Sequence, residues 1–343
     1  MSKEGIYGKT ARYDRDFLVS TENKKYKVTH LGDLCYNPAN LKFGVICLNT
    51  YGDAIFSPIY VTFEIEASFD PDFIGAYLTR WDFINRALKY QQGTVYERMA
   101  VSPEDFVSIK CCFPQKAEQT RLAEFITLLD KRIAAQGKYV ESLKKYKRGL
   151  LSSVFSQNVS LFSTAAFYAF SELAVRRSEK YDPKCNAHAV CIELEHIEQE
   201  TGRIIGSTCA DYQNSIKTVS KPGDVMFGKL RPYLRKYAFV QKECVCSSEI
   251  WSLIPTDIVI PKYLFYLIQS EAFMKAANVS SGTKMPRAEW STIAKSGYPI
   301  PSKDDQQATV DILETTDRII VSHVASYDRL IEYKKGLLQR LFI

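Results

Sequence analysis

One long segment occurs twice in this chain, and this internal repeat constrains the fold more than any other feature. Residues 114–156 align with residues 301–343 without a gap, at a constant offset of 187 residues. The matches begin with Pro114 and Pro301 and continue to a shared Gly-Leu-Leu triplet near the end of each copy. A repeat of this length predicts one architectural unit that is used twice.

Both copies have the apolar periodicity of a long helix with one buried stripe. Mostly apolar residues recur at alternating spacings of four and three, which predicts a coiled-coil-like seam that another helix must cover. Neither copy has an interior proline, and about 37 residues at roughly 1.5 Å each would give a helix of roughly 55 Å. The predicted hydrophobic seam residues are Leu122, Ile126, Leu129, Ile133, Leu143 and Leu150 in the first copy and Leu313, Ile320, Leu330 and Leu337 in the second.

Polar residues recur at matching seam positions. These pairs are Gln136 with His323 and Lys147 with Lys334. Buried polar seam positions lower stability but fix the register and the number of partners. The simplest arrangement therefore packs the two copies against each other, antiparallel and with a pseudo-twofold relation; the alternative is that each helix lies separately on its own domain. Gly149 and Gly336 each cost a helix about 1 kcal/mol relative to alanine, and they predict a close helix crossing or a break before the last turn.

The segments ahead of the two copies also echo each other, which predicts a globular domain in front of each helix. SPIYVTF, which starts at Ser57, lies 190 residues before SSEIWSL, which starts at Ser247. Short alternating runs bounded by turn residues predict strands around both landmarks, and residues 72–89 and 261–277 have a helical pattern. The predicted fold class is α/β (α+β), with two globular domains separated by two long antiparallel helices. The predicted segments are 1–113, 114–156, 157–300 and 301–343.

The first domain is predicted to be shorter at its front than the second. About 87 residues precede the second landmark when counted from Ser160, whereas 56 precede the first. We therefore expect that the first domain lacks an N-terminal segment, that it is simply smaller, or that another chain supplies the missing piece.

Composition and charge narrow the class of protein. No apolar run approaches the ~20 residues that span a bilayer, and the N-terminus does not resemble a signal peptide, so we expect a cytoplasmic protein without a membrane partner. Nine cysteines, an odd number without framework spacing, fit a reducing compartment. The net charge of +6 is uneven, since residues 114–156 carry +5 and residues 157–300 carry +3. Such a distribution suits a polyanion as partner.

Motifs for catalysis are largely missing from the sequence. It contains neither a GxxxxGK[ST] phosphate cradle nor a GxGxxG turn after a strand, and its four histidines are scattered. Asn37-Pro38 has only part of the Asn-Pro-Pro-Tyr pattern of amino-methyltransferases, and we interpret it as a turn. Cys185, His188 and Cys191 are zinc-ligand types, but their spacing is not the paired CxxC pattern. The sequence therefore predicts no catalytic residue, no metal and no cofactor.

Two basic, turn-rich segments in the second domain are the strongest candidates for a binding surface. Residues 221–237 combine five cations and two tyrosines with glycine and proline, and residues 280–287 form a second such loop. Arginine can donate two hydrogen bonds to guanine O6 and N7, while lysine, serine and threonine contact phosphates. An ordinary basic surface is the alternative. The predicted DNA-binding residues are Lys229, Arg231, Tyr233, Arg235, Lys236, Thr283, Lys284 and Arg287 in the second domain and Gln92, Thr94 and Arg98 in the first.

Taken together, these segments resemble one known family. The repeated helix, which ends in Tyr-Lys-(Arg/Lys)-Gly-Leu-Leu, is similar to the conserved regions of type I restriction–modification specificity subunits. The segments GDVMFGKLRPYLRKY, CSSEIW and SGTKMPRAEW resemble one recurring class of their target recognition domains. YNPAN followed by SPIYVTF resembles another class. The similarity covers nearly the whole chain.

This resemblance implies a function without chemistry of its own. Two target recognition domains would each read one half of a bipartite site in double-stranded DNA, and the long helices would set the spacing between the halves. Methyltransferase (modification) subunits and endonuclease/translocase (restriction) subunits would dock on the chain. The alternatives are a helical scaffold without sequence-specific DNA binding, a truncated and partly inactive specificity subunit, or an enzyme fragment such as a nuclease.

Overall fold

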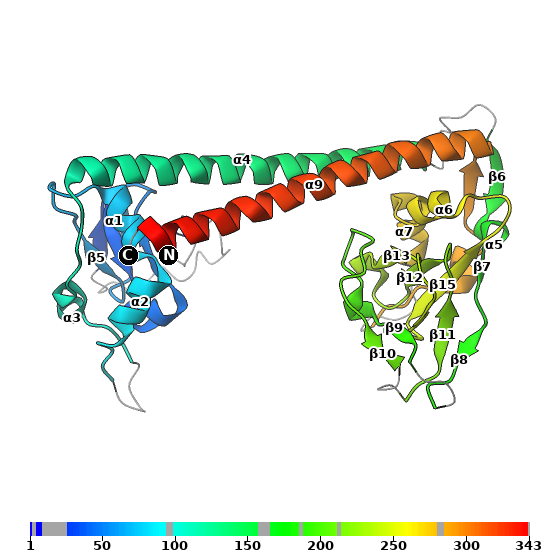
Figure 1. Cartoon of the computed structure of the whole chain (residues 1–343), viewed down its shortest axis with the longest axis horizontal. Helices are drawn as coiled ribbons and strands as arrows, with labels where there is room; N and C mark the ends of the chain where they lie inside the picture. The colour runs from blue at the N-terminus through cyan, green and yellow to red at the C-terminus, as the bar shows by residue number, and fades with distance from the viewer. Residues whose placement is uncertain are drawn as a thin grey trace. The chain divides into compact units, whose positions relative to one another are not determined.

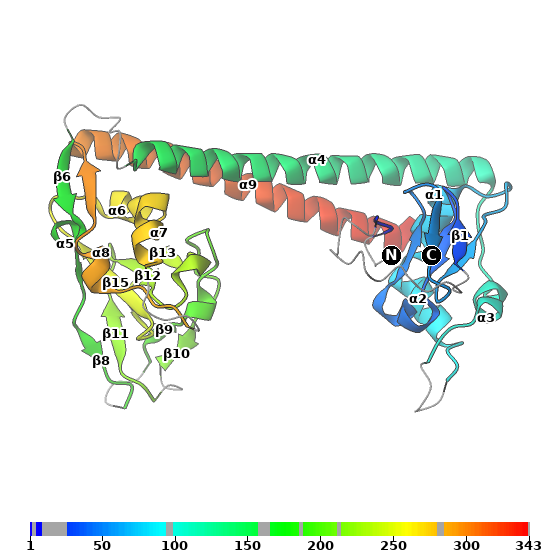
Figure 2. The same ribbon diagram turned by 180° about the vertical axis from the view of Figure 1, so that it is seen from behind.

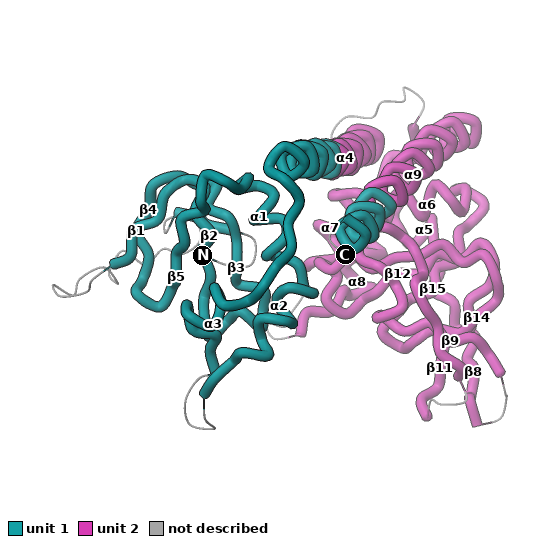
Figure 3. The backbone as a smooth tube through the Cα atoms, turned by 60° about the vertical axis from the view of Figure 1, so that its left-hand side comes forward, with its two compact units in different colours: residues 1–135, 328–343 teal, residues 136–327 magenta. Residues whose placement is uncertain are grey.

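Two compact units make up the chain, and each contains one globular domain with part of each long helix (Figure 3). Unit 1 comprises residues 1–135 and 328–343, and unit 2 comprises residues 136–327. The long helices are α4 (Lys116–Val154) and α9 (Lys303–Leu341), so the division between the units falls within both helices (Figure 1). The four-segment division expected from the sequence ends at the helix termini instead and stays a prediction. The computed structural model describes residues 1, 5–8, 26–93, 99–156, 165–184, 188–210, 214–279 and 285–341.

Two ion pairs join α4 to α9, one inside each unit. In unit 2, Lys147 Nζ lies 2.7 Å from Asp317 Oδ1. In unit 1, Lys334 Nζ lies 2.5 Å from Asp130 Oδ1. The offset of 187 residues converts one pair into the other, because it relates the two lysines and also the two aspartates. The pseudo-twofold relation predicted from the repeat is therefore present in the contacts.

The contacts in unit 2 also give the direction of the helices. Gln136 Nε2 donates to the backbone oxygen of His323 at 3.0 Å. The rings of Tyr139 and His323 pack edge to face, with their centroids 4.8 Å apart. Going from Lys147 back to Gln136 on α4 corresponds to going forward from Asp317 to His323 on α9. The helices therefore run antiparallel, as predicted. Gln136 and His323 occupy matching positions of the repeat, so they meet close to the pseudo-twofold axis.

The predicted hydrophobic seam faces inward on both helices. All ten of its residues are buried or half-buried, and Ile126 and Leu313 are among the most enclosed, at 6% and 1% exposed. The period of the seam is thus explained by helix pairing and by contact with the domains.

Within the ranges that the structure describes, no helix is both long and apolar enough to cross a membrane.

The close approach between the helices occurs at a different glycine from those expected. A Cβ atom added to Gly137 would lie 3.1 Å from the ring of Tyr327, so glycine lets these two segments approach closely. Gly149 and Gly336 have nothing within 4 Å of such an atom, and both helices continue through them. The predicted crossing or break at Gly149 and Gly336 is wrong, because both residues face open space.

The second domain contains three sheets. Its strands are β6 (Ala166–Ala169), β7 (Ala174–Arg176), β8 (Lys180–Tyr181), β9 (Val190–Ile192), β10 (Thr208–Cys209), β11 (Lys217–Ser220), β12 (Val225–Gly228), β13 (Tyr237–Phe239), β14 (Cys244–Cys246), β15 (Ile250–Pro255) and β16 (Gly297–Ile300). Its short helices are α5 (Phe170–Leu173), η4 (Leu194–His196), η6 (Pro232–Leu234), α6 (Pro261–Leu267), α7 (Glu271–Ala277) and α8 (Trp290–Ile293). The described strands are ordered β13-β12-β15-β7, β10-β9-β14-β11-β8 and β16-β6.

The core of the second domain joins its central sheet to the long helices. Phe227 of β12 and Phe273 of α7 are fully buried and pack in one cluster with Leu151 of α4 and Leu313 of α9. Figures 1 and 2 show α6 and α7 lying between this sheet and the two long helices. Burial of this apolar surface, at about 25 cal/mol per Å², holds the domain against the helix pair.

The first domain repeats part of this plan. Its strands are β1 (Lys27–Thr29), β2 (Leu34–Tyr36), β3 (Ile46–Leu48), β4 (Ala54–Phe56) and β5 (Val61–Phe63). Its short helices are η3 (Pro38–Phe43), α1 (Pro71–Leu78), α2 (Trp81–Leu88) and α3 (Pro103–Ser108). Among the described residues, the sheets are β3-β2-β5 and β1-β4. Ala123 of α4 packs into its core beside Phe73 and Phe83.

The helical pattern predicted at 72–89 and 261–277 is confirmed, and each of these segments consists of two short helices separated by a break. α1 ends at Thr79, whose Oγ1 donates to the carbonyl of Gly75 at 2.8 Å. α7 begins after Ser270, whose side chain accepts a hydrogen bond from the backbone of Phe273 at 3.2 Å. These caps satisfy backbone groups at the breaks, while both halves bury apolar residues in one core and so keep the apparent periodicity.

A glutamine near the start of each long helix ties the helix to its domain. Gln119 Oε1 accepts from the backbone nitrogen of Asp70 at 3.0 Å, and its Nε2 donates to the carbonyl of Pro114 at 2.8 Å. Gln306 Oε1 accepts from the backbone nitrogen of Ile260 at 2.8 Å. Because both glutamines are buried, each of these amides fixes one domain at one place on its helix.

Candidate nucleic-acid interface

The two basic segments predicted in the second domain meet through backbone hydrogen bonds. Arg231 N donates to the carbonyl of Pro286 at 2.8 Å, and Ala288 N donates to the carbonyl of Lys229 at 2.8 Å. Between these bonds, Leu230 and Arg287 form an antiparallel bridge. Segments more than fifty residues apart in the chain thus form one rigid ledge, made of residues 229–231 and 286–288. Hereafter we call it the basic ledge.

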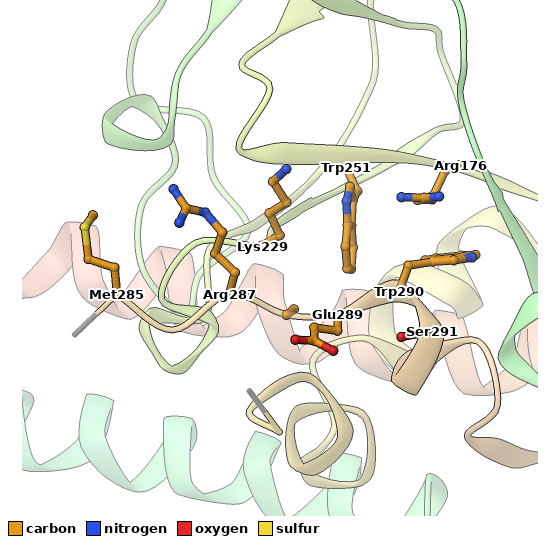
Figure 4. Close-up of a pocket in the computed structure, with 9 residues that line it drawn as sticks. Arg176, Lys229, Trp251, Met285, Arg287, Glu289, Trp290 and Ser291 are labelled. Carbon is orange, nitrogen blue, oxygen red and sulfur yellow. The ribbon is translucent and has the colours of Figure 1, made fainter. Parts of the chain in front are cut away.

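The ledge borders an open groove of about 610 Å³. Figure 4 shows Lys229, Arg287 and Arg176 around the rim, with Trp251 standing between Lys229 and Arg176. Arg176 comes from β7 and Trp251 from β15, the neighbouring strand in the sheet. Three cations therefore converge on one shallow surface, as an anionic ligand requires.

Two tryptophans and an arginine line this groove side by side. The rings of Trp251 and Trp290 meet edge to face, with centroids 5.7 Å apart. The Arg176 guanidinium lies 4.9 Å from the Trp290 ring centroid and 5.9 Å from that of Trp251. Both contacts are in the cation–π range. The sequence analysis missed Arg176 as a site residue, because it lies far from the basic loops in the chain.

One acidic residue, Glu249, contacts the basic ledge. Glu249 accepts two hydrogen bonds from Arg287, at 3.1 Å from Nε and 3.2 Å from the terminal nitrogen Nη2. The backbone carbonyl of Glu249 also accepts from Lys229 N at 2.9 Å. The Glu249 carboxylate raises the pKa of Arg287 further above its ordinary value. Glu249 was another omission of the sequence analysis, although it directly precedes β15.

The other predicted DNA-binding residues of segment 221–237 differ in how exposed their side chains are and in whether they already have hydrogen-bond partners. Arg231 is exposed and has a left-handed backbone, with φ of 51°, and Tyr233 is 54% exposed. Arg235 is half-buried and lies 2.5 Å from Glu271 Oε1. Lys236 Nζ donates to the carbonyl of Leu194 at 2.6 Å. The side chains of Arg235 and Lys236 therefore already have partners within the domain. Thr283 and Lys284 lie outside the described residues.

The first domain has a related junction between two loops. Val101 N donates to the carbonyl of Pro38 at 3.3 Å, at positions that correspond to Ala288 and Lys229 in the second domain. Gln92 exchanges two backbone hydrogen bonds with Ala100, and its exposed side chain donates to Asp105 at 3.1 Å. Thr94 and Arg98 lie outside the described residues.

Asn37-Pro38 forms a turn, as interpreted from the sequence. The Asn37 Oδ1 atom accepts hydrogen bonds from the backbone nitrogens of Ala39 and Asn40, both at 3.1 Å. Asn37 is 3% exposed and caps η3. Its amide is therefore part of the local backbone structure, which is the ordinary role of an Asx turn.

The described residues hold no cluster of three or more histidine, cysteine, aspartate or glutamate side chains that could bind a metal ion. Cys191 lies buried in β9, and burial raises the pKa of its thiol to about 12. The thiol is therefore protonated near neutral pH, whereas the thiolate is the form that binds metals and attacks electrophiles. Cys185 lies beyond the described ranges.

Known proteins share both the sequence and the fold of this chain. Residues 178–330, which contain the basic ledge, match the family model described as the type I restriction modification DNA specificity domain. In this region the chain is similar to type I specificity subunits. The matched region begins after β7 and covers the rest of the second domain together with residues 303–330 of α9.

Curated relatives bear the same description. Over 269 residues the chain is 22% identical to the type I restriction enzyme MjaVIII specificity subunit of Methanocaldococcus jannaschii, covering 70% of this chain and 63% of that protein. It is 28% identical over 145 residues to the HindI specificity subunit of Haemophilus influenzae, covering 40% of this chain and 31% of that protein. The chain thus spans less than two thirds of the length of either relative.

Solved structures support the fold class. A structure described as the basis of complex assembly and conformational transition of the type I R-M system has a TM-score of 0.63 at 17% identity, and the match covers 94% of this chain and 84% of that one. The crystal structure of the type I S subunit from M. genitalium has a TM-score of 0.52 at 15% identity, with 93% and 84% covered. The predicted class, two α/β domains with two long antiparallel helices, is confirmed.

Proposed function

We propose that this type I specificity-subunit relative reads double-stranded DNA without catalysing a reaction, as the DNA-sequence specificity subunit of a type I restriction–modification complex. The observation that carries this proposal is the basic ledge, a rigid backbone junction with cations on an open groove, inside the region that matches the DNA specificity domain. We expect the protein to act in the cytoplasm, where its DNA target is found.

The side chains of the ledge suit two kinds of DNA contact. Lys229 is half-buried and offers a point charge to a phosphate. Arg231 and Arg287 are exposed and offer planar donor edges that fit guanine O6 and N7. Arg176, lying on Trp290, adds a third cation to the same groove. We infer that phosphate contacts position the domain and that the arginines read bases.

The long helices suit the role of a ruler between two half-sites. Repeated ion pairs, Lys147 with Asp317 and Lys334 with Asp130, fix the register of α4 against α9 inside each unit. Slipping either helix by one turn would move both lysines away from their aspartates. We therefore infer that helix length and register set the spacing of the bipartite target.

Exposed apolar residues on the long helices support docking of protein subunits. Phe125 and Ile312 occupy equivalent positions of the repeat and are 44% and 57% exposed. Tyr146 and Tyr333 are likewise equivalent, at 59% and 56% exposed. Each unit presents one residue of each pair, so the same apolar surface occurs twice. We infer that two copies of the methyltransferase subunit dock on these residues and that endonuclease subunits join the resulting complex.

Methylation profiling tests the proposal. The chain would be expressed with a methyltransferase subunit of a type I system, and modified bases would then be mapped across the genome of the host. The proposal expects modification at one bipartite sequence, and expects it to disappear when the chain is omitted. Modification without sequence preference, or with the same preference in the absence of the chain, would overturn it. A helical scaffold predicts the first of these outcomes, and cleavage of DNA by the isolated chain with Mg²⁺ would favour a nuclease.

A further inference from the structure

The pair formed by Arg287 and Glu249 leaves one edge of the arginine available. A guanidinium has five N–H donors, and Glu249 accepts from Nε and from Nη2 of Arg287. The remaining donors are both hydrogens of the other terminal nitrogen and one hydrogen of Nη2. These lie on the outer edge of the fork, which is the edge that can address two acceptors side by side. The Arg287 side chain is 49% exposed, so that edge is accessible to a ligand.

Both members of the pair are held by rigid backbone. Glu249 sits in a turn closed by a 2.9 Å hydrogen bond from Ile250 N to the carbonyl of Ser247, and its own carbonyl accepts from Lys229 N. Arg287 belongs to the basic ledge, where it is bridged to Leu230. The Glu249 side chain is 26% exposed, about half the exposure of Arg287. Glu249 is thus the less exposed member of the pair, and its two hydrogen bonds restrict the rotation of the Arg287 guanidinium.

A carboxylate at this place carries an electrostatic cost on a DNA-binding surface. Glu249 offsets the positive charge of Arg287 and repels phosphates, so it should weaken sequence-independent binding. If Arg287 only contacted a phosphate, the surface would bind more tightly without Glu249. The carboxylate can still favour specific binding by orienting the Arg287 guanidinium. The planar edge of a guanidinium must point at two acceptors, whereas a point charge has no such requirement.

We propose that Glu249 is a positioning residue for sequence reading, which holds Arg287 so that its outer edge donates to O6 and N7 of one guanine in the major groove. The inference rests on the proposed function, since it assigns a base to a residue of the proposed DNA-reading domain. Arg287 makes the contact, and Glu249 acts through it.

The test measures binding of the full chain, in complex with its methyltransferase subunit, to two kinds of duplex at one salt concentration. The first is the preferred duplex, selected from a random library, and the second is a duplex of unrelated sequence. In Glu249→Gln, affinity for the preferred duplex should fall about tenfold while affinity for the unrelated duplex rises. Discrimination at one G·C pair should fall by a factor of roughly 5 to 150, the range of one bidentate contact. The other positions of the site should keep their preferences.

Replacing the contacted guanine with 7-deazaguanine removes the N7 acceptor and gives a second readout. Wild type should lose affinity on this duplex, whereas Glu249→Gln should show little further loss. Arg287→Lys keeps the charge without the fork, so it should also show little further loss on the 7-deazaguanine duplex, while its affinity for the unrelated duplex should stay close to that of wild type. Glu195→Gln removes an exposed carboxylate of the same domain, whose side chain is 83% exposed, and serves as the matched charge control.

The outcomes separate the inference from the function on which it rests. If Glu249→Gln tightens binding to every duplex by one factor and keeps full discrimination, then Glu249 is only a local charge and the inference is overturned. If Glu195→Gln loses discrimination equally, general electrostatics explain the effect and the inference fails. If wild type prefers no sequence at all, the proposed function itself fails.

Discussion

The two domains have the same central strands but different surroundings for them. In the first, β2 lies between β3 and β5, with Tyr36 opposite Ile46 and Val61. In the second, β12 lies between β13 and β15 in a matching register, and β15 has a further neighbour in β7. Within the described part of the first domain, β5 has β2 as its one strand neighbour. The two domains thus share a three-stranded central sheet and differ in the strands at its edge.

An equivalent pair of apolar residues in each domain shows how the additional strands of the second domain change burial. Val219 and Val245 are cross-strand neighbours in the second domain and are 8% and 3% exposed, because they pack in a cluster with Cys191 and Ala210. In the first domain, the corresponding residues of β1 and β4 are Val28 and Ile55, at 56% and 66% exposed. The same strand pairing therefore occurs with and without a cover. Burial in these domains is decided by the added strands and not by the repeated ones.

The loops at the candidate interface differ in chemistry while their backbone is similar. Gly44 closes η3 with φ of 74°, and Arg235 closes η6 with φ of 50°, at corresponding positions. Ahead of them, the first domain has Pro38 where the second has Lys229. A shared scaffold with different side chains is what two unlike half-sites would require.

The largest expected effect compares the two ion pairs of the long helices. Asp317→Ala should destabilise the protein by about 3–5 kcal/mol, because it leaves Lys147, whose side chain is 10% exposed, without its carboxylate. Asp130→Ala should cost about 1 kcal/mol or less, since the side chains of Lys334 and Asp130 are 27% and 48% exposed. Urea unfolding midpoints of the two variants measure the difference. Equal shifts would show that the repeat makes the two contacts energetically equivalent.

A second comparison concerns DNA reading by the two domains. Arg231→Ala should weaken specific binding by about 1–3 kcal/mol and relax the preference at one base pair of a single half-site. Asn40→Ala, at the corresponding place in the first domain, should leave the base preference at the half-site that Arg231 reads unchanged. Binding to duplexes substituted one base pair at a time measures both effects. Uniform weakening on all sequences by Arg231→Ala would mean that this arginine contacts only phosphate.

A third comparison uses the covered and uncovered apolar pairs. Val245→Ala should cost about 2 kcal/mol, because the removed methyl groups leave a cavity in a closed cluster. Ile55→Ala should change the free energy of unfolding by about 0.5 kcal/mol or less, as for other exposed positions. Thermal denaturation of the two variants provides the measurement. A loss at Ile55 as large as that at Val245 would show that this face of the first domain is covered in solution.

The smallest expected effect concerns an exposed contact of the first domain. His30 Nδ1 lies 3.0 Å from Asp53, and a side-chain hydrogen bond to Asp53 raises the pKa of His30 above 6.5. Since the folded pKa is the higher one, this contact stabilises fully below about pH 6.5 and loses its contribution as the pH rises through the folded value. In Asp53→Asn, the pKa of His30 measured by NMR titration should fall toward 6.5. An unchanged titration would contradict this account of the shift.

Sequence alone was sufficient for the long helices and their pairing. The 187-residue offset and the seam spacing can both be read directly from the sequence. In a helix, residues three and four positions apart lie on the same face, so this spacing alone predicts which residues form the seam. The repeat showed that Gln136 and His323 occupy equivalent positions, but only the structure shows that these two residues meet. Spacing could not show which glycine allows the close approach, because Gly137 is set apart from Gly149 only by the ring of Tyr327 on the other helix.

The candidate site needed the folded chain to become visible. Lys229 and Arg287 could be proposed from the sequence, since charge clustered with turn residues is a local signal. Glu249 and Arg176 could not, because the register of β15 with β7 and the turn before β15 bring them to the basic ledge from distant parts of the chain. Residue types limit what chemistry a surface can perform. Pairing between strands that are distant in the sequence decides which residues share that surface. Patterns over a few neighbouring residues do not show which strands will pair.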